Sequence, residues 1–471
     1  MTDVSLRKQA TSGAAWSGVS TIVLRLGSLM VGIVLARLLT PEQFGVFAVA
    51  LTVQSILMTV ADLGLSSDLV RAEDPDRIAP TIASLGLLSG SLTALVTIAS
   101  SGWLASTMGA AEAAPAIATL AVTLFLAGVS VVPYAYMLRR FQQRELFWVG
   151  VVDFIVYTAV TLTLVALGFG VMGLALGRVA AQMVASTLQF VFARMRPRYG
   201  IARDQIRPIL AYSLPIACAN LLAWALLNVD NVVLARPAGA TALGYYVLAF
   251  NVSSWPMTAL SQVVRSISLP YFSRVDDPAV GVERVSSLGW ALALPASGMI
   301  AVLSAPIISV LYGENWLPAA PALAVLGVYG AVRVIFDVAT GYLYARGRSR
   351  PVLWIQLGWL VSMVIGMVAV VPVWGILGAA AVHVVTGVGL ILPAYLGVLS
   401  RSGVPIKRFL YAHLPPTLAT VPAVIAAWGA TFVGGGAATA LLLGGLVGVL
   451  VYAAAIWPWL RRRLRHSPGG S

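Results

Sequence analysis

Two stripes of polar side chains within apolar stretches are the residues best suited to bind a ligand. The later stripe has intervals of mostly three and four residues, which place its members on one helical face. Its members are Asn251, Ser254, Trp255, Thr258, Ser261, Gln262 and Arg265. The earlier stripe consists of Thr52, Ser55, Thr59, Asp62 and Ser66. Polar groups are costly against lipid, so the stripes should face each other or a water-filled cavity. Such a cavity could hydrogen-bond a polar solute.

Arg25 is a charged residue in the middle of another apolar stretch, on a predicted helical face with Ser17, Thr21 and Ser28. No acidic residue lies three or four positions away, so Arg25 lacks a partner along its own helix. A guanidinium group can donate two parallel hydrogen bonds to phosphate or carboxylate oxygens. We therefore predict that Arg25 binds an anionic ligand.

Other charges inside apolar stretches are candidate site residues with a structural alternative. Arg178 and Arg333 could add to an anion site, but Arg333 lies four residues before Asp337 and the two could neutralise each other. Asp62 and Asp337 could bind a coupling ion. Structural roles are favoured for the remaining intramembrane polar groups, which are Asp153, Asp230 and His383.

The composition is that of a polytopic membrane protein. Of 471 residues, 59% are hydrophobic and 10% are charged, whereas a soluble domain has about 25% charged residues. The net charge of +13 resides in short loops between apolar spans, which argues against a nucleic-acid partner. A single cysteine, Cys218, excludes an intrachain disulfide and a cysteine-cluster metal site.

Enzymatic motifs are absent from the sequence. It has no G-x-x-x-x-G-K-[ST] loop for ATP hydrolysis. Its three histidines have no metal-ligand spacing. We therefore expect neither an enzyme nor a cofactor.

We predict an all-α fold of about fourteen transmembrane helices, each of about 20 largely apolar residues. The predicted spans are 12–38, 46–66, 81–107, 115–138, 149–169, 172–193, 209–235, 244–268, 287–312, 320–345, 352–372, 377–400, 415–435 and 437–460. A tight hairpin, Leu39 to Gly45, joins the first two.

Basic residues predict the orientation of the helices. Most of the 30 Lys and Arg residues precede the first helix or follow the even-numbered helices. Connections after odd-numbered helices hold Arg236, and Arg37 lies at a helix end. Because basic loops stay on the cytoplasmic side, both termini are predicted to be cytoplasmic.

An internal repeat divides the chain into two lobes. The run Leu35-Ala36-Arg37 recurs without a gap as Leu234-Ala235-Arg236, and Gly45 recurs as Gly244. Helices 1–6 and 7–12 thus form two six-helix lobes in parallel orientation, a known transporter architecture. We predict an N-terminal lobe with its linker at residues 1–208, a C-terminal lobe at 209–414, and two extra helices with a basic tail at 415–471.

The opening residues carry a family resemblance. They are Gly13-Ala14-Ala15-Trp16, Arg25, the run from Leu35 through Thr40-Pro41-Glu42-Gln43-Phe44-Gly45, and Ala61-Asp62-Leu63-Gly64-Leu65. This pattern resembles bacterial polysaccharide flippases of the Wzx type, in the multidrug/oligosaccharidyl-lipid/polysaccharide exporter superfamily. The resemblance covers the whole helical plan.

The resemblance implies translocation of an undecaprenyl-pyrophosphate-linked oligosaccharide from the cytoplasmic to the outer leaflet of the bacterial inner membrane, for surface polysaccharide biosynthesis. It also implies a V-shaped pair of lobes, with helices 1, 2, 7 and 8 lining a cationic cavity. The partners would be the lipid-linked glycan, membrane lipid, a polysaccharide polymerase and glycosyltransferases.

By alternating access, Arg25, helped by Arg178 and Arg333, would pair with the pyrophosphate. Trp224 or Trp255 could stack on a sugar, while hydroxyls would bond to the polar residues Asn220, Asn228, Asn251, Ser254, Thr258 and Gln262. The sequence departs from a symmetric cationic cavity in one respect. Trp224 stands at the repeat position of Arg25, so a cation there comes from one lobe only.

Three alternatives remain open, one a second kind of transporter and two from other classes of protein. A cation-coupled multidrug extruder of the same superfamily should favour acids in its cavity, whereas arginines are prominent here. A membrane glycosyltransferase or polymerase is disfavoured by short outward loops. A non-transport assembly protein would leave the repeated polar stripes without a purpose.

The charge asymmetry predicts which single cysteines an impermeant maleimide labels from outside, in a Cys218→Ser background. Cysteines at Glu112 and Glu314 should be labelled, whereas cysteines at Arg140, Arg348 and Ser467 should remain protected until the membrane is permeabilised. Outside labelling at Arg348 would contradict the orientation.

Overall fold

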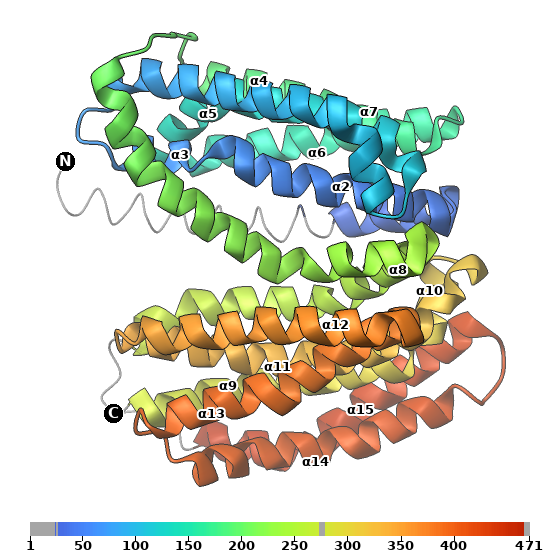
Figure 1. Cartoon of the computed structure of the whole chain (residues 1–471). Helices are drawn as coiled ribbons and strands as arrows, with labels where there is room; N and C mark the ends of the chain where they lie inside the picture. Colours follow the sequence, from blue (N-terminus) through green and yellow to red (C-terminus); the bar gives the residue numbers. More distant parts are fainter. Residues whose placement is uncertain (1–23, 25–26, 273–277, 466–471) are drawn as a thin grey trace. The chain divides into compact units, whose positions relative to one another are not determined.

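The computed structural model describes residues 24, 27–272 and 278–465, and every regular element in that range is helical (Figure 1). The α-helices are α2 (Pro41–Asp62), α3 (Leu65–Arg71), α4 (Pro75–Thr107), α5 (Ala114–Arg139), α6 (Gln143–Ala166), α7 (Gly170–Ala193), α8 (Arg203–Phe272), α9 (Pro278–Val302), α10 (Ser304–Leu311), α11 (Ala320–Ala345), α12 (Ser349–Thr386), α13 (Leu392–Ser400), α14 (Ile406–Ala430) and α15 (Ala437–Arg465). Two short 3-10 helices, η1 (Ala111–Ala113) and η2 (Glu314–Ala319), and a π-helix, η3 (Gly387–Ile391), complete the set. The predicted all-α class is confirmed.

Twelve segments of the described residues are long and apolar enough to cross a membrane. One of them, Ser349–Ser400, contains the two predicted spans 352–372 and 377–400. Gly375 interrupts its helical backbone at φ 51° and ψ −136°. A Cβ at Gly366 would lie 2.8 Å from a methyl carbon of Val382, so the segment folds back on itself around Gly375. The total of fourteen stays a prediction, because most of the first span lies outside the described residues.

The hairpin predicted at Leu39 to Gly45 is wrong in its second half, because α2 already begins at Pro41. The Thr40 hydroxyl accepts a hydrogen bond from the Gln43 amide at 3.2 Å, and the Gln43 side chain accepts one from the Thr40 amide at 3.1 Å. This capping box, with Pro41 in the first helical position, starts the helix early.

The second predicted span, 46–66, is not one continuous helix. Leu63 and Gly64 adopt left-handed backbone angles, with φ of 48° and 72°, and separate α2 from α3. A Cβ at Gly64 would lie 2.6 Å from the backbone oxygen of Ser213 on α8. Glycine therefore serves both the left-handed turn and the close approach of α8.

The chain divides into two compact units, one ending at Gly244 and the other beginning at Tyr245. In the first unit α5 contacts α2, α3, α4 and α7, and in the second α11 contacts α9, α12 and α13. These helices correspond to the predicted spans 115–138 and 320–345, which are the fourth members of the two repeat copies. The fourth helix of each repeat copy is thus the one that contacts several other helices of its unit. The lobe limits at 208 and 414 remain predictions, because contacts group neighbouring helices rather than repeat copies.

Small residues allow close helix packing in the first unit. Gly86 and Gly90 of α4 lie against Gly128 of α5, and a Cβ at Gly90 would lie 2.7 Å from the backbone oxygen of Leu124. Such contacts replace the hydrophobic effect as the source of helix association inside a bilayer.

The two C-terminal helices pack on α9 in the second unit. Glu283 of α9 pairs with Arg408 of α14 at 2.7 Å and with Arg463 of α15 at 3.5 Å. Trp290 of α9 also donates a hydrogen bond to Thr417 of α14 at 2.9 Å. The ion pairs and the packing attach these helices to the second unit.

Candidate functional site

Three hydroxyls of the α2 stripe donate their hydrogen bonds to the backbone of α2 itself. The hydroxyls of Thr52, Ser55 and Thr59 donate to backbone carbonyls three or four residues earlier, at 2.8, 2.9 and 3.0 Å. Back-bonding of this kind removes the cost of an unpaired donor in lipid. It leaves lone pairs on the half-buried hydroxyls of Ser55 and Thr59 that can accept hydrogen bonds, whereas Thr52 is buried. The stripe is therefore suited to ligands that carry hydrogen-bond donors, such as hydroxyl groups.

One member of the stripe on the later part of α8 repeats this geometry. Ser254, the repeat partner of Ser55, donates to the backbone oxygen of Asn251 at 3.0 Å. The Asn251 side chain is exposed and Trp255 is half-buried. The side chains of Thr258 and Gln262 lie outside the part of the chain whose side chains the structure describes.

Trp224 of α8 is hydrogen-bonded to the polar stripe of α2. Its indole N–H donates to the Ser55 hydroxyl at 2.9 Å. Asn228 donates to the backbone oxygen of Trp224 at 3.0 Å, and Asn220, one turn earlier, is exposed. Of the residues predicted to contact a ligand, the structure thus places Trp224 beside the α2 stripe. Arg25 lies outside the described residues.

Two glycines at equivalent repeat positions lie against each other. A Cβ at Gly45 would overlap the backbone oxygen of Ala240, and a Cβ at Gly244 would overlap that of Pro41. Only glycine permits this approach of α2 to α8. The contact belongs to the end of the first unit that the basic-residue pattern assigns to the outside.

Other connections of the first unit converge on the same end. A Cβ at Gly109, which follows α4, would lie 3.1 Å from the Cα of Arg236, and a Cβ at Gly170, which begins α7, would lie 3.1 Å from the side-chain nitrogen Nε2 of Gln43. These connections all follow odd-numbered predicted helices. Their meeting agrees with the alternation of sides that the sequence predicts.

Asp62 is the one acid of the α2 stripe. It is half-buried at the last residue of α2, where the Ser66 hydroxyl donates to its carboxylate at 3.5 Å. A negative charge at a helix C-terminus is unfavourable, so a proton or a cation would stabilise this position. A coupling role for Asp62 remains a proposal on this ground.

Arg178 of α7 forms an ion pair within the first unit. Its guanidinium lies 2.9 Å from the carboxylate of Asp153 on α6, and it also donates to Gln182 at 3.3 Å. Gln182 continues the chain of hydrogen bonds to Ser186, whose hydroxyl lies 3.2 Å from that of Ser130. The charge of Arg178 is thus largely opposed before any ligand binds.

In the second unit, Arg333 and Asp337 are half-buried one turn apart on α11. His383 of α12 is buried, with a ring nitrogen 2.8 Å from the Tyr246 hydroxyl. The rings of Phe250 and Tyr329 also surround His383. This is the packing role that the sequence favoured for His383.

The described residues hold no group of three or more His, Cys, Asp or Glu side chains that could bind a metal ion. Sequence reasoning missed one feature, a cavity in the first unit under residues 194–199. The sequence indicated only a linker here, at the end of the predicted N-terminal lobe. Neither periodicity nor spacing shows that a linker folds back over the ends of distant helices.

Residues 34–321 match the polysaccharide biosynthesis protein family. This chain belongs to that family. Among its relatives is the lipopolysaccharide biosynthesis protein WzxC of Escherichia coli, 27% identical over 356 residues, which are 73% of this chain and 72% of the relative. Another is the succinoglycan biosynthesis transport protein ExoT of Rhizobium meliloti, 24% identical over 431 residues, 89% of this chain and 86% of the relative. The expected resemblance is confirmed.

The fold of this family member is shared with solved transporters. The lipid II flippase MurJ, in an inward closed conformation, superposes with a TM-score of 0.80 over 96% of this chain and 99% of MurJ, at 14% identity. An inward-facing multidrug resistance MATE transporter gives a TM-score of 0.62 over 80% of this chain and 96% of the transporter, at 16% identity. The chain is thus a multi-pass membrane protein that shares its fold with these transporters.

The ion pair of Arg178 predicts a non-additive response to mutation. Arg178→Ala should lower the amount of folded protein in the membrane, because Asp153 keeps a charge without a partner, at a cost on the order of 3 kcal/mol. The double variant Arg178→Gln/Asp153→Asn should recover most of that loss. Membrane abundance and the melting temperature of purified protein measure both effects. A stable Arg178→Ala protein that binds no substrate would instead give Arg178 a ligand role.

The glycine contact predicts a conformational effect. In Gly45→Leu the side chain cannot fit against Ala240, so α2 and α8 should separate at the outer end. A reporter cysteine at Asn220, in a Cys218→Ser background, should then react severalfold faster with an impermeant maleimide added outside. Gly102→Leu is the control, because a Cβ at Gly102 meets no atom within 4 Å. Equal labelling in both variants would contradict a closed outer end.

Proposed function

We propose that this protein is a flippase that moves an undecaprenyl-pyrophosphate-linked oligosaccharide from the cytoplasmic to the outer leaflet of a bacterial inner membrane, for surface polysaccharide biosynthesis. Family membership and the transporter fold support translocation. The choice of substrate is supported mainly by the hydroxyl oxygens of α2, which can accept hydrogen bonds. Trp224 lies beside them and donates to Ser55 at 2.9 Å. Carbohydrate hydroxyls are donors that match such a surface, and an indole ring offers a face for sugar stacking.

In the proposed mechanism the sugar headgroup enters the polar cavity while its polyprenyl tail stays in lipid. The hydroxyls of α2 and the amides of Asn220 and Asn228 bind the glycan. Arg25 pairs with the pyrophosphate, and Arg333 adds to the positive charge. Arg178 contributes less, because Asp153 opposes its charge at 2.9 Å.

Rocking of the two lobes would then open the outer end and close the inner one. The contact between Gly45 and Ala240 is the seal that must break. Both termini stay on the cytoplasmic side, where the glycosyltransferases that supply the substrate would act. The polysaccharide polymerase would use the product in the outer leaflet.

The membrane potential assists this direction of transport. Each negative charge of the headgroup gains about 2.3 kcal/mol per 100 mV on moving outward across an inside-negative membrane. Asp62 and Asp337 are the proposed sites for a coupling ion. Transport should therefore depend on the potential or on an ion gradient.

A cation-coupled multidrug extruder is the second candidate, favoured by the fold shared with the MATE transporter and by the carboxylate of Asp62. Deletion of the gene distinguishes the two functions. A flippase deletion should cause a lipid-linked oligosaccharide to accumulate on the cytoplasmic leaflet and surface polysaccharide to be lost. An extruder deletion should leave both unchanged and raise sensitivity to cationic drugs.

Arg25 gives the sharpest test of the pyrophosphate site. Arg25→Ala should abolish glycan export at normal membrane abundance, because the anion loses a bidentate donor. Arg25→Lys should retain partial export, because the charge survives without the planar fork. Export is measured as surface polysaccharide in cells complemented with each variant. Normal export by a well-expressed Arg25→Ala protein would contradict the proposal.

A reduced amount of Arg25→Ala protein would show a structural partner instead. An unpaired buried acid would then cost several kcal/mol, and a second substitution that neutralises this acid should restore abundance.

A further inference from the structure

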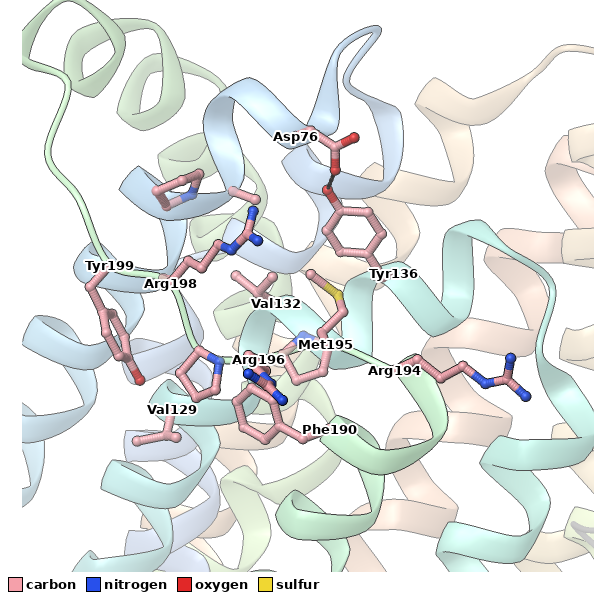
Figure 2. Close-up of a pocket in the computed structure, with 15 residues that line it drawn as sticks. Asp76, Val129, Val132, Tyr136, Phe190, Arg194, Met195, Arg196, Arg198 and Tyr199 are labelled. Atoms are coloured by element: carbon pink, nitrogen blue, oxygen red, sulfur yellow. Dashed lines mark hydrogen bonds between the residues drawn. The ribbon is translucent and has the colours of Figure 1, made fainter.

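A cavity of about 670 Å³ lies in the first unit, away from the α2 stripe. Its walls come from the N-terminal turns of α4 and the C-terminal turns of α5 and α7, and residues 194–199 cross it (Figure 2). These helix ends all belong to the side that the basic residues predict to be cytoplasmic. The cavity is therefore placed at the inner membrane–water interface.

The segment that crosses the cavity is fixed at both ends. Arg194 ends α7 in a left-handed conformation, and its amide donates to the backbone oxygen of Val191 at 3.1 Å. At the other end Gly200 and the Ser84 hydroxyl exchange hydrogen bonds of 3.0 Å in both directions. The Ala202 amide also donates to the Thr81 hydroxyl at 3.2 Å. Hydrogen bonds at both ends thus hold the segment in a defined position over the cavity.

The cavity combines a basic rim with an apolar floor. Figure 2 shows the Arg196 and Arg198 side chains over the cavity and Arg194 directed away from it. Neither Arg196 nor Arg198 has a hydrogen bond or an ion pair in the part of the chain that the structure describes. The floor is formed by the apolar side chains of Val129, Val132, Phe190 and Met195.

One acid, Asp76, lies among the lining residues. Its carboxylate accepts a hydrogen bond from the Tyr136 hydroxyl (Figure 2). Asp76 thus already accepts a hydrogen bond from Tyr136, while the guanidinium groups of Arg196 and Arg198 can still bind an anion. The lining carries a net positive charge toward an incoming group.

We propose that this cavity binds the phosphate-bearing headgroup of an anionic lipid of the cytoplasmic leaflet, with Arg196 and Arg198 on the phosphate and the first acyl carbons on the apolar floor. The cytoplasmic leaflet is negatively charged and attracts basic segments at the interface. Arginine donates well to phosphate oxygens. A small soluble anion would use the arginines but not the apolar floor, so an amphiphile accounts for both features.

The bound lipid would hold the segment between α7 and α8 against the ends of α4 and α5. This site is separate from the proposed transport cavity, so it is tested by binding and not by export. The full-length protein is purified in detergent, and its affinity for phosphatidylglycerol and for zwitterionic phosphatidylcholine is measured by native mass spectrometry. The wild type should bind phosphatidylglycerol at least about tenfold more tightly, on the scale of one charge-assisted hydrogen bond.

Arg196→Gln/Arg198→Gln should weaken phosphatidylglycerol binding about tenfold and leave phosphatidylcholine binding unchanged. Arg346→Gln/Arg350→Gln is the matched control, because it removes the same charge from exposed side chains outside the cavity. Val129→Trp keeps both arginines and fills the cavity, so it should also weaken binding. Size-exclusion profiles and melting temperatures confirm folding, and the single variant Arg196→Gln replaces the double one if the latter misfolds.

Equal loss in the control pair would reduce the effect to general surface charge and overturn the proposal. Unchanged binding in Val129→Trp would overturn the role of the cavity. Inorganic pyrophosphate provides the last arm. If it displaces phosphatidylglycerol at equal concentration, the site takes a soluble anion and the lipid assignment is wrong; failure to displace it supports the lipid.

Discussion

Every polar group inside a bilayer must be satisfied by the protein, by water or by a ligand, and the arrangement of this molecule follows from that constraint. The hydroxyls of α2 meet it by donating to their own backbone, and Ser254 repeats the solution on α8. Arg178 meets it through Asp153, and His383 through Tyr246. Once the donors are used in this way, the half-buried hydroxyls of Ser55 and Thr59 keep lone pairs that can accept, and Trp224 already donates to Ser55. A carbohydrate, which is rich in donors, complements such a surface.

Close contacts at glycines bring α2 and α8 together. Gly45 and Gly244 allow α2 and α8 to approach at one end, and Gly64 allows a second approach near the other. A contact between glycine backbones involves no side chain and little surface, so breaking it costs little free energy. The repeat explains why equivalent glycines meet, because each copy supplies the same hairpin.

Much of this could be predicted from the sequence, because lipid imposes simple rules on composition and charge. The helical class and the meeting of the connections of Gln43, Gly109 and Arg236 at one end of the first unit follow from those rules. The side of the membrane on which that end lies stays a prediction. The early start of α2 needed the geometry of Thr40 and Gln43, and the break at Gly64 needed the neighbouring Ser213. The pairing of Arg178 with Asp153 on another helix, and the cavity under Arg196, depend on tertiary contacts that spacing along one helix does not contain.

Translocation of a lipid-linked glycan by the purified protein tests the central claim most directly. The protein is reconstituted into vesicles with a fluorescent polyprenyl-pyrophosphate oligosaccharide, and the fraction quenched by an impermeant reagent is followed over time. We predict that protein-containing vesicles exchange the labelled lipid between leaflets faster than empty vesicles, and faster again when a potential drives the headgroup toward the positive side. A rate equal to that of empty vesicles, at either potential, would contradict the account.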